Sequence, residues 1–599
     1  MVPHLLTEET PKSSNGTTTS EASYGGSSIT KLITANPFGL TTDPNLIRGT
    51  TYTSDGTLIN QTIYAIASKI FSYETIGAEN LLDSYIQVWL HNQQSNAFGI
   101  VPFYNKFEVR SGASNAILGY FKKNGTHGQP VSTILGASGI DYMKTSLSGQ
   151  NAPLALNVSA VDFVDNALVS NYGRVLNAAR DLGFPVFTPT ESGIETQHLA
   201  VLNHFYAFAT GKPSVFLFEG VDAAKSFKKI KDVLSVDEIG QLYQNLLDSA
   251  PSADISVDAA FGLLNQFTGK NYSQFEYLGG QNAKTVFVAY GTHVNDQWKN
   301  LVGEDIGLIQ VRVPVPFNQD VFSQVVPQST KKLVVLTPGN DKLKADISAA
   351  LFLSNRYYSL SIEEFKYPFD FNWTPITIAK TISKFDSQVK IERILPSYDS
   401  EPKDQIITAN TSPEGNWLFW SRDDRIVVDT VDKLALSLSL DDTKNVAIRN
   451  KYDNSKSGGV FFSQISSTTG SFSTTDAADV VVIEDLSLLN SYDILATAKP
   501  GATVIYINQK QLIDVEKLPL EFKKSLALNH NKLVAVDFTV VDALDETNNG
   551  TKGLTAELLL QLAFWRVTLP ELGDYIVNKL LQANGGSFEL LATVLDNFI

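Results

Sequence analysis

Residues Tyr277 to Pro338 decide the fold, and they read YLGGQNAKTVFVAYGTHVNDQWKNLVGEDIGLIQVRVPVPFNQDVFSQVVPQSTKKLVVLTP. Short runs of β-branched and aromatic residues alternate here with polar connections of helical length. The runs Thr285–Tyr290, Gly307–Val313 and Lys332–Leu336 predict three strands, because such residues favour extended backbone. Pro314 cannot donate to a β-ladder, so the second strand must end before it. Strands that alternate with helices indicate βαβ units and a mainly parallel sheet.

The composition of the chain excludes several kinds of chemistry. A length of 599 residues predicts several domains, because a single hydrophobic core rarely grows beyond about 300 residues. The chain has no cysteine, which rules out disulfides, thiolate zinc sites, a cysteine nucleophile and an iron-sulfur cluster bound by this chain. A net charge of −16 opposes binding to nucleic acid or anionic membranes. The one modest basic cluster, Lys225 to Lys231, is expected to be the solvated face of a helix.

The sequence also argues against membrane insertion and export. The first residues, MVPHLLTEETPKSS, lack the basic and apolar regions of a secretory signal. The most apolar run, Leu554–Leu569, is interrupted by Glu557, Gln561 and Arg566, which predicts an amphipathic packed helix. We therefore expect a cytoplasmic protein with neither nucleic acid nor membrane among its partners.

Patterning along the chain predicts an α/β protein of several three-layer domains with mainly parallel sheets. Residues 1–35 are rich in Ser, Thr, Gly and Glu, so we expect a disordered tail. Apolar runs of strand length alternate with helical patterns in 36–250, 251–400 and 417–599, which predicts three α/β domains. Residues 401–416 are polar and interrupted by prolines, as expected of a linker.

One helix in the first domain has clear local signals. Ser192 to Glu195 fits a capping box, in which the serine and the glutamate each satisfy a backbone donor. Gly211 is expected to end this helix in a left-handed conformation. His198 and His204 are six residues apart, so they do not point the same way as a metal-binding pair would. Both histidines are expected to be structural.

The motifs of cofactor-binding enzymes are missing or incomplete. Gly136–Gly139 and Gly279–Gly280 are too short for phosphate-binding loops and predict plain turns. Gly573-Asp574-Tyr575 departs from the Gly-Asp-Gly start of a thiamine diphosphate motif. Arg356–Ser359 fits the loose R-x-Y-S pattern of flavin-binding barrels, but it follows a helix in a βαβ context, so we interpret it as coincidence. We assign no catalytic, cofactor-binding or metal-binding residue from the sequence.

Several stretches nevertheless resemble a known family. They are Asn36–Gly39, Arg110–Ala113, Phe275–Phe317 with its strings FEYLGGQNAKTVFVAYG and IGLIQVRVPVPFN, and Ser348–Phe352. In these stretches the chain is similar to the N-terminal half of the fungal NADPH-dependent sulfite reductase flavoprotein (alpha) subunit, and the resemblance covers nearly everything from Asn36 onward. That half in turn resembles pyruvate:ferredoxin oxidoreductase.

The resemblance implies a type for each domain. It implies a thiamine-diphosphate-binding-like fold for 36–250, a transketolase C-terminal-like domain for 251–400 and a pyruvate/ketoisovalerate oxidoreductase gamma-like domain for 417–599. The last is supported by the strings GGVFFSQIS, DVVVIEDLSLL and KPGATVIYIN.

The resemblance also implies a role in reducing sulfite to sulfide during sulfate assimilation, which supplies cysteine and methionine. In that family FAD and NADPH bind a C-terminal half, whereas a beta (hemoprotein) subunit carries siroheme and an iron-sulfur cluster. The sequence ends at Ile599 before such a half begins, so we expect a scaffold and assembly region without its own cofactor. We expect it to bind the beta subunit and to self-associate. Two alternatives stay open: a 2-oxoacid:ferredoxin oxidoreductase-type subunit that uses thiamine diphosphate contributed across an interface, and a non-catalytic binding paralogue.

Overall fold

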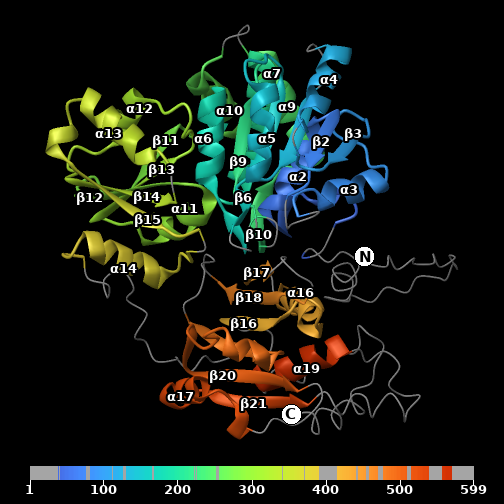
Figure 1. The fold of residues 1–599 in the computed structure, drawn as a ribbon, viewed down its shortest axis with the longest axis vertical. Helices are drawn as coiled ribbons and strands as arrows, with labels where there is room; N and C mark the ends of the chain where they lie inside the picture. The colour runs from blue at the N-terminus through green and yellow to red at the C-terminus, as the bar shows by residue number, and fades with distance from the viewer. Residues whose placement is uncertain are drawn as a thin grey trace, which may run out of the picture.

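The computed structural model shows three large β-sheets covered by helices (Figure 1). It describes residues 38, 41–75, 81–110, 112–125, 130–164, 167–220, 223, 226–250, 255–339, 341–369, 371–389, 414–439, 443–452, 458–469, 477–508, 515–537 and 556–568. Two sheets lie side by side in the upper part of Figure 1, and the third lies below them. The architecture confirms the predicted fold class, α/β with largely parallel sheets.

The first sheet has six strands in the order β3-β2-β4-β5-β9-β8, and every neighbouring pair is parallel. Its strands are β2 (Lys69–Tyr73), β3 (Phe103–Phe107), β4 (Val131–Leu135), β5 (Leu154–Ser159), β8 (Val186–Phe187) and β9 (Ser214–Phe218). A hairpin of β6 (Val161–Val164) and β7 (Ala167–Ser170) follows β5. The strands β2, β4, β5 and β9 are fully buried, as expected for a parallel sheet with helices on both faces.

The described residues of this part of the chain form eight α-helices. They are α2 (Asp55–Ile66), α3 (Ser84–His91), α4 (Asn115–Asn124), α5 (Ala137–Leu147), α6 (Tyr172–Leu182), α7 (Ile194–Thr210), α9 (Val236–Ser249) and α10 (Val257–Thr268), with a short 3-10 turn η1 (Pro44–Leu46) before them. Gly211 follows α7 with φ 63°, which confirms the predicted left-handed end.

The second sheet has five strands in the order β11-β13-β12-β14-β15, and only β11 is antiparallel to its neighbour. They are β11 (Phe275–Leu278), β12 (Thr285–Tyr290), β13 (Ile306–Val311), β14 (Lys332–Pro338) and β15 (Ser361–Tyr367). The three strands predicted between residues 277 and 338 are confirmed as β12, β13 and β14. Between and after these strands lie α11 (Thr292–Trp298), η2 (Lys299–Leu301), α12 (Gln319–Val325), α13 (Leu343–Leu353), η3 (Tyr357–Ser359) and α14 (Pro375–Phe385).

The third sheet has eight strands in the order β1-β10-β17-β18-β16-β19-β20-β21. They are β1 (Gly49–Thr53), β10 (Ser226–Val233), β16 (Gly415–Arg422), β17 (Asn445–Tyr452), β18 (Val460–Thr468), β19 (Ala478–Ile483), β20 (Ala498–Asn508) and β21 (Lys532–Asp537). The part from β1 to β16 is antiparallel, whereas β16, β19, β20 and β21 run parallel. Around this sheet lie η4 (Leu486–Asn490), η5 (Val515–Lys517), α16 (Ile426–Ser439), α17 (Leu520–Leu528) and α19 (Ala556–Thr568).

The third sheet joins segments that are far apart in the sequence. Strands β1 and β10 belong to the N-terminal part of the chain, yet β10 pairs with β17 through Ser226↔Arg449, Phe227↔Ile448 and Lys228↔Ala447. Phe38 and Phe227 pack in the same hydrophobic core as Trp417 and Trp565. The N-terminal α/β unit is therefore continuous with the C-terminal sheet.

Three local predictions are wrong. Gly136–Gly139 is not a plain turn, because Gly136 is the N-cap of α5 and the next three residues begin that helix. The N-cap of α7 is Gly193, with φ 105° and no side-chain cap, so Ser192 to Glu195 is not a capping box. Glu195 instead turns away to a buried ion pair with Arg312, which is a stronger interaction than a cap. The basic cluster from Lys225 to Lys231 is not a helix face, because Ser226–Val233 forms strand β10. Hydrogen bonding to β1 and β17 fixes this segment as a strand.

Other predictions stand as follows. The amphipathic helix within Leu554–Leu569 is confirmed as α19, which buries Leu562, Phe564 and Trp565. No helix among the described residues is long and apolar enough to span a membrane. The predicted tail at 1–35, most of the predicted linker at 401–416 and the Gly573-Asp574-Tyr575 motif lie outside the described residues.

Candidate functional site

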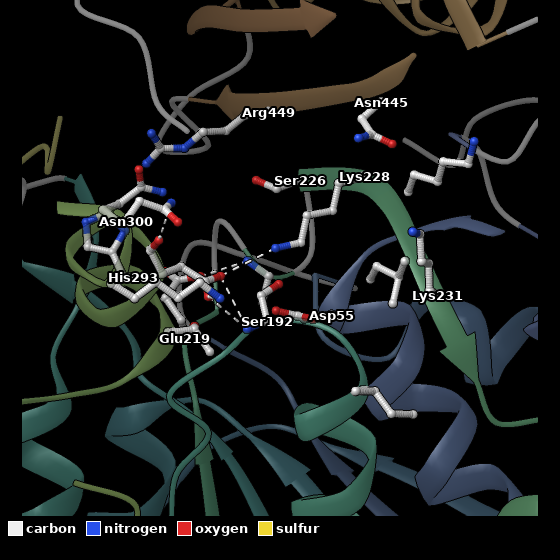
Figure 2. Close-up of a pocket in the computed structure, with 18 of the residues that line it drawn as sticks. Asp55, Ser192, Glu219, Ser226, Lys228, Lys231, His293, Asn300, Asn445 and Arg449 are labelled. Atoms are coloured by element: carbon white, nitrogen blue, oxygen red, sulfur yellow. Dashed lines mark hydrogen bonds and ion pairs between the residues drawn. The ribbon is translucent and has the colours of Figure 1, made fainter. Parts of the chain in front are cut away.

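The candidate site is a cavity of about 480 Å³ where the three sheets meet. It lies beyond the carboxyl ends of β9 and β12, a common place for ligands in α/β proteins. Glu219 directly follows β9, and Thr292 and His293 begin the helix after β12. Strands β10 and β17 cover these ends from the opposite side (Figure 2).

The register of the third sheet places three polar side chains on the face toward the cavity. Ser226 and Lys228 are two residues apart on β10, and Arg449 on β17 is directly opposite Ser226. Because side chains alternate between the two faces of a strand, all three point to the same face. Phe227 and Ile448 point to the other face and pack in the hydrophobic core below. Figure 2 shows Ser226, Lys228 and Arg449 on the same side of the cavity.

The opposite wall is an acidic cluster fixed by backbone donors. Asp55, the first residue of α2, accepts a hydrogen bond from the Gly193 amide at 2.7 Å. Asp296 on α11 accepts from the Ser192 amide at 3.2 Å. The ammonium groups of Lys228 and Lys299 each lie 3.4 Å from an oxygen of Asp296. The wall thus connects α2, the loop before α7, α11 and β10.

Burial and neighbouring charges shift the pKa values of these groups. Burial raises the pKa of the Asp55 carboxyl, although nearby Lys228 opposes that effect. Burial lowers the pKa of Lys299, but the charges of Asp296 and Glu191 outweigh it, so the pKa of this ammonium group is raised overall. Lys299 therefore stays charged at neutral pH, and the site combines charges of both signs.

A second polar network joins the first two sheets below the cavity. Arg312 follows β13 and forms two hydrogen bonds with Glu195 on α7, at 2.9 Å from Nε to Oε1 and 3.0 Å from Nη2 to Oε2. Arg312 also contacts Glu276 at 2.7 Å and lies 5.4 Å from the ring centre of Tyr272. The Tyr272 hydroxyl is 3.0 Å from Nδ1 of His198. This network fixes α7 against the second sheet.

The residues weighed as possible ligands from the sequence, His198, His204 and Arg356, do not form one site. His198 contacts Tyr272, whereas Nδ1 of His204 donates to the Ala200 carbonyl at 2.7 Å and its Nε2 contacts Ser132 at 2.9 Å. Both histidines are buried and hydrogen-bonded within the protein, as expected of structural residues. Arg356 donates to the carbonyls of residues 323, 326 and 327, so this arginine caps the chain after α12. Its R-x-Y-S pattern forms the turn η3, not a barrel strand.

The residues of the cavity gave little signal in the sequence. Asp55, Lys228, Asp296 and Arg449 belong to segments separated by up to several hundred residues, and no motif links them. The available signal was positional: Gly291 ends a buried strand at the carboxyl edge of a parallel sheet, where ligands commonly bind. The wall formed by β10 and β17 depends on long-range pairing.

The chain just after β9 is closely packed, and its carboxylate already has hydrogen-bond partners. At the end of β9, Glu219 already accepts from the Ser170 hydroxyl at 2.6 Å and the Ala223 amide at 2.7 Å. Gly220 packs so closely that a Cβ there would lie 1.9 Å from Oγ of Ser159. The described part of the chain contains no group of three acidic or histidine side chains that could bind a metal ion.

Fold and site together define a multi-unit α/β protein with an open cavity between its units that is lined by charged side chains. No protein-family model matches the chain. Among curated proteins, the chain is similar to the sulfite reductase [NADPH] flavoprotein component of Saccharomyces cerevisiae, with 28% identity over 588 residues, 94% of this chain and 53% of the relative. A probable component of the same name from Schizosaccharomyces pombe is 25% identical over 507 residues, 80% of this chain and 47% of the relative. These similarities confirm the resemblance predicted from the sequence.

The chain is also similar to two ferredoxin oxidoreductases. The pyruvate:ferredoxin oxidoreductase of Moorella thermoacetica is 24% identical over 607 residues, 89% of this chain and 50% of the relative. Among solved structures, a 2-oxoglutarate:ferredoxin oxidoreductase from Magnetococcus marinus has a TM-score of 0.40 at 12% identity, covering 56% of this chain and 65% of that one. The chain spans about half the length of the curated relatives it matches.

Proposed function

We propose that this chain is the scaffold and assembly region of an NADPH-dependent sulfite reductase flavoprotein component, part of an enzyme that reduces sulfite to sulfide. The observation that carries this proposal is the similarity to the Saccharomyces cerevisiae component, which extends over 94% of the chain. In this proposal FAD and NADPH bind elsewhere in the flavoprotein component. Siroheme and the iron-sulfur cluster belong to a hemoprotein partner, because this chain has no cysteine to bind a cluster.

Rigid connections between the units support a scaffold role. The pairing of β10 with β17 joins the first and third sheets through backbone hydrogen bonds. The buried ion pair between Glu195 and Arg312 joins the first and second sheets. A scaffold needs such connections, because domains joined only by small polar interfaces move relative to one another. The three sheets are therefore suited to position a partner.

Co-purification tests the proposal. The tagged chain is expressed together with an untagged sulfite reductase hemoprotein subunit and purified through the tag. We expect the siroheme absorption bands in the eluate, whereas an unrelated tagged protein, used as the control, recovers none. The chain purified alone should be colourless and should not oxidise NADPH. Failure to recover siroheme, or NADPH oxidation by the chain alone, would contradict the scaffold role.

A second candidate function is a 2-oxoacid:ferredoxin oxidoreductase-type subunit that uses thiamine diphosphate contributed across an interface. The similarity to pyruvate:ferredoxin oxidoreductase over 89% of the chain favours it. Calorimetry with thiamine diphosphate and Mg²⁺ separates the two functions, because saturable binding heat is expected only for the second. A chain that binds neither thiamine diphosphate nor the hemoprotein would instead be a non-catalytic binding paralogue.

A further inference from the structure

The lining of the cavity carries cationic as well as acidic side chains. The chain carries a net charge of −16, yet the lining includes five cationic and four acidic side chains. The cationic ones are Lys228, Lys229, Lys231, Lys299 and Arg449, and the acidic ones are Asp55, Glu219, Asp232 and Asp296. Of these cations, Lys228 and Arg449 lie on the face of β10 and β17 that is turned to the cavity, so an anionic ligand would find charged donors at this place.

The acidic side chains of the wall already accept hydrogen bonds from donors other than Lys228. Asp55 accepts from the Gly193 amide at 2.7 Å, and Asp296 accepts from the Ser192 amide at 3.2 Å. Glu219 accepts from Ser170 at 2.6 Å and from Ala223 at 2.7 Å. Because these contacts do not involve β10, an anion can compete for the lysine without leaving the carboxylates unpaired.

The opposite wall presents polar side chains from two strands, of which Arg449 also donates to Oδ1 of Asn372 at 3.3 Å. Oγ of Ser226 is buried and has no hydrogen-bond partner among the described residues, although it lies in the lining of the cavity. Arg449, directly across the ladder from Ser226, is only 5% exposed. Lys228 points into the cavity beside them (Figure 2). A guanidinium, an ammonium and a hydroxyl group on one face match the oxygens of a phosphate or sulfo group.

We propose that this cavity binds a small organic anion through a phosphate or sulfo group, with Lys228, Arg449 and Ser226 as the donors. The volume of about 480 Å³ lies within the range of small-molecule sites, roughly 300–1,000 Å³, and leaves room for an organic part beside α11. Because α11, β10 and β17 come from all three parts of the chain, bound ligand also restrains the parts relative to one another. This inference goes beyond the proposed function and does not depend on it.

Calorimetry on the full chain tests the inference with three matched probes: phosphoglycolate, sulfoacetate and glycolate. We expect saturable binding of phosphoglycolate or sulfoacetate that weakens as salt is added, because salt screens partly exposed charges. The difference between these two probes identifies the preferred group. Glycolate, which lacks both groups, should bind at least about tenfold more weakly. Equal binding of glycolate, or no saturable binding of any probe, would overturn the proposal.

Two variants place the binding in this cavity. Lys228→Met should weaken binding at least about tenfold, whereas Lys122→Met, at an exposed lysine on α4, should leave it unchanged. Ser226→Ala should also weaken binding and should keep the fold, because the Ser226 hydroxyl has no partner to lose among the described residues. Hydrogen exchange should show added protection of β10, β17 and α11. Unchanged binding in Ser226→Ala and Lys228→Met, or protection confined to other elements, would refute the site.

Discussion

Arg312 and Glu195 form two parallel hydrogen bonds, at 2.9 and 3.0 Å, while their side chains are only 3% and 4% exposed. The arginine follows strand β13 of the second sheet, and the glutamate lies in the first turn of α7 beside the first sheet. A charge that is removed from water needs such a partner, because an unpaired buried carboxylate is strongly unfavourable. The pair therefore connects two sheets, and substitution of either residue alone leaves the charge of the other buried without this partner.

We expect Arg312→Met to lower the free energy of unfolding by about 3–5 kcal/mol, because it leaves the Glu195 carboxylate buried without its charged partner. Urea denaturation followed by tryptophan fluorescence measures the effect. The double variant Glu195→Gln with Arg312→Met should be less destabilised than the sum of the single variants. The control is Lys524→Met, which removes a surface ion pair with Glu521 and should cost at most about 1 kcal/mol. Equal effects of Arg312→Met and the control would contradict this role.

Gly220 lies just after β9, close to the end of β5 and the start of β6. A Cβ at this position would lie 1.9 Å from Oγ of Ser159 and 2.0 Å from Cγ2 of Val161. We expect Gly220→Ala to destabilise the protein by about 1–3 kcal/mol, because buried neighbours must move to make room. The matched control is Gly262→Ala in helix α10, where a Cβ meets nothing within 4 Å, and this change should stabilise by up to about 1 kcal/mol. Thermal unfolding checks both, and a stable Gly220→Ala variant would show that the close approach is not required.

The sequence predicted those parts of the fold that depend on local signals. The strands β12, β13 and β14 follow from runs of β-branched and aromatic residues, and Gly211 marks the end of α7. The pairing of β10 with β17 could not be predicted, because its partners are more than 200 residues apart and no local pattern records which strands meet. The same pairing places Lys228 and Arg449 at the cavity. The site could therefore not be predicted without first predicting this sheet.

Local signals also failed where tertiary contacts were stronger. Ser192 to Glu195 has the residue types of a capping box. The Glu195 carboxylate nevertheless accepts hydrogen bonds from Arg312, more than 100 residues away in the sequence. The residues from Lys225 to Lys231 include four lysines, yet Ser226–Val233 forms a strand, because backbone pairing on both sides outweighs the polar composition. In both cases the deciding partner lies on another part of the chain.

Substitution of Arg356 tests whether the R-x-Y-S pattern has a structural role instead of binding flavin. Its guanidinium donates to the carbonyls of Ser323, Val326 and Pro327 at 3.2, 2.7 and 2.8 Å, which secures the chain after α12. We expect Arg356→Ala to lower the free energy of unfolding by about 2 kcal/mol, because hydrogen bonds from a charged donor are lost. Arg110→Ala is the control, since the Arg110 side chain is 78% exposed and its loss should cost less than about 1 kcal/mol.

Flavin titration of the same variants completes that test. Neither the parent chain nor Arg356→Ala should change the fluorescence of added FAD, because the arginine already donates to backbone carbonyls. Flavin binding that disappears in Arg356→Ala would reverse the structural interpretation.

The lowered pKa values of two buried histidines predict how the free energy of unfolding depends on pH. Burial lowers the pKa of His204 to about 4, although the Ala200 carbonyl opposes the shift, and burial with nearby Lys270 lowers the pKa of His198 to about 4. The folded protein therefore favours the neutral rings, whereas the unfolded chain protonates them near the ordinary pKa of 6.5. Their contribution is complete above that pH and is lost as the pH falls toward 4.

As the pH falls from 6.5 toward 4, we expect each histidine to lower the free energy of unfolding by up to about 1.4 kcal/mol per pH unit, because the unfolded chain binds the proton more readily. Urea midpoints measured from pH 7.5 down to pH 4.5 give the slope. Carboxylates also titrate there, so the decisive comparison is His198→Gln, which should reduce the slope because one titrating ring is removed while its contact with Tyr272 can be kept by an amide. A parent slope that His198→Gln leaves unchanged would mean that His198 does not bind protons differently in the folded and unfolded states.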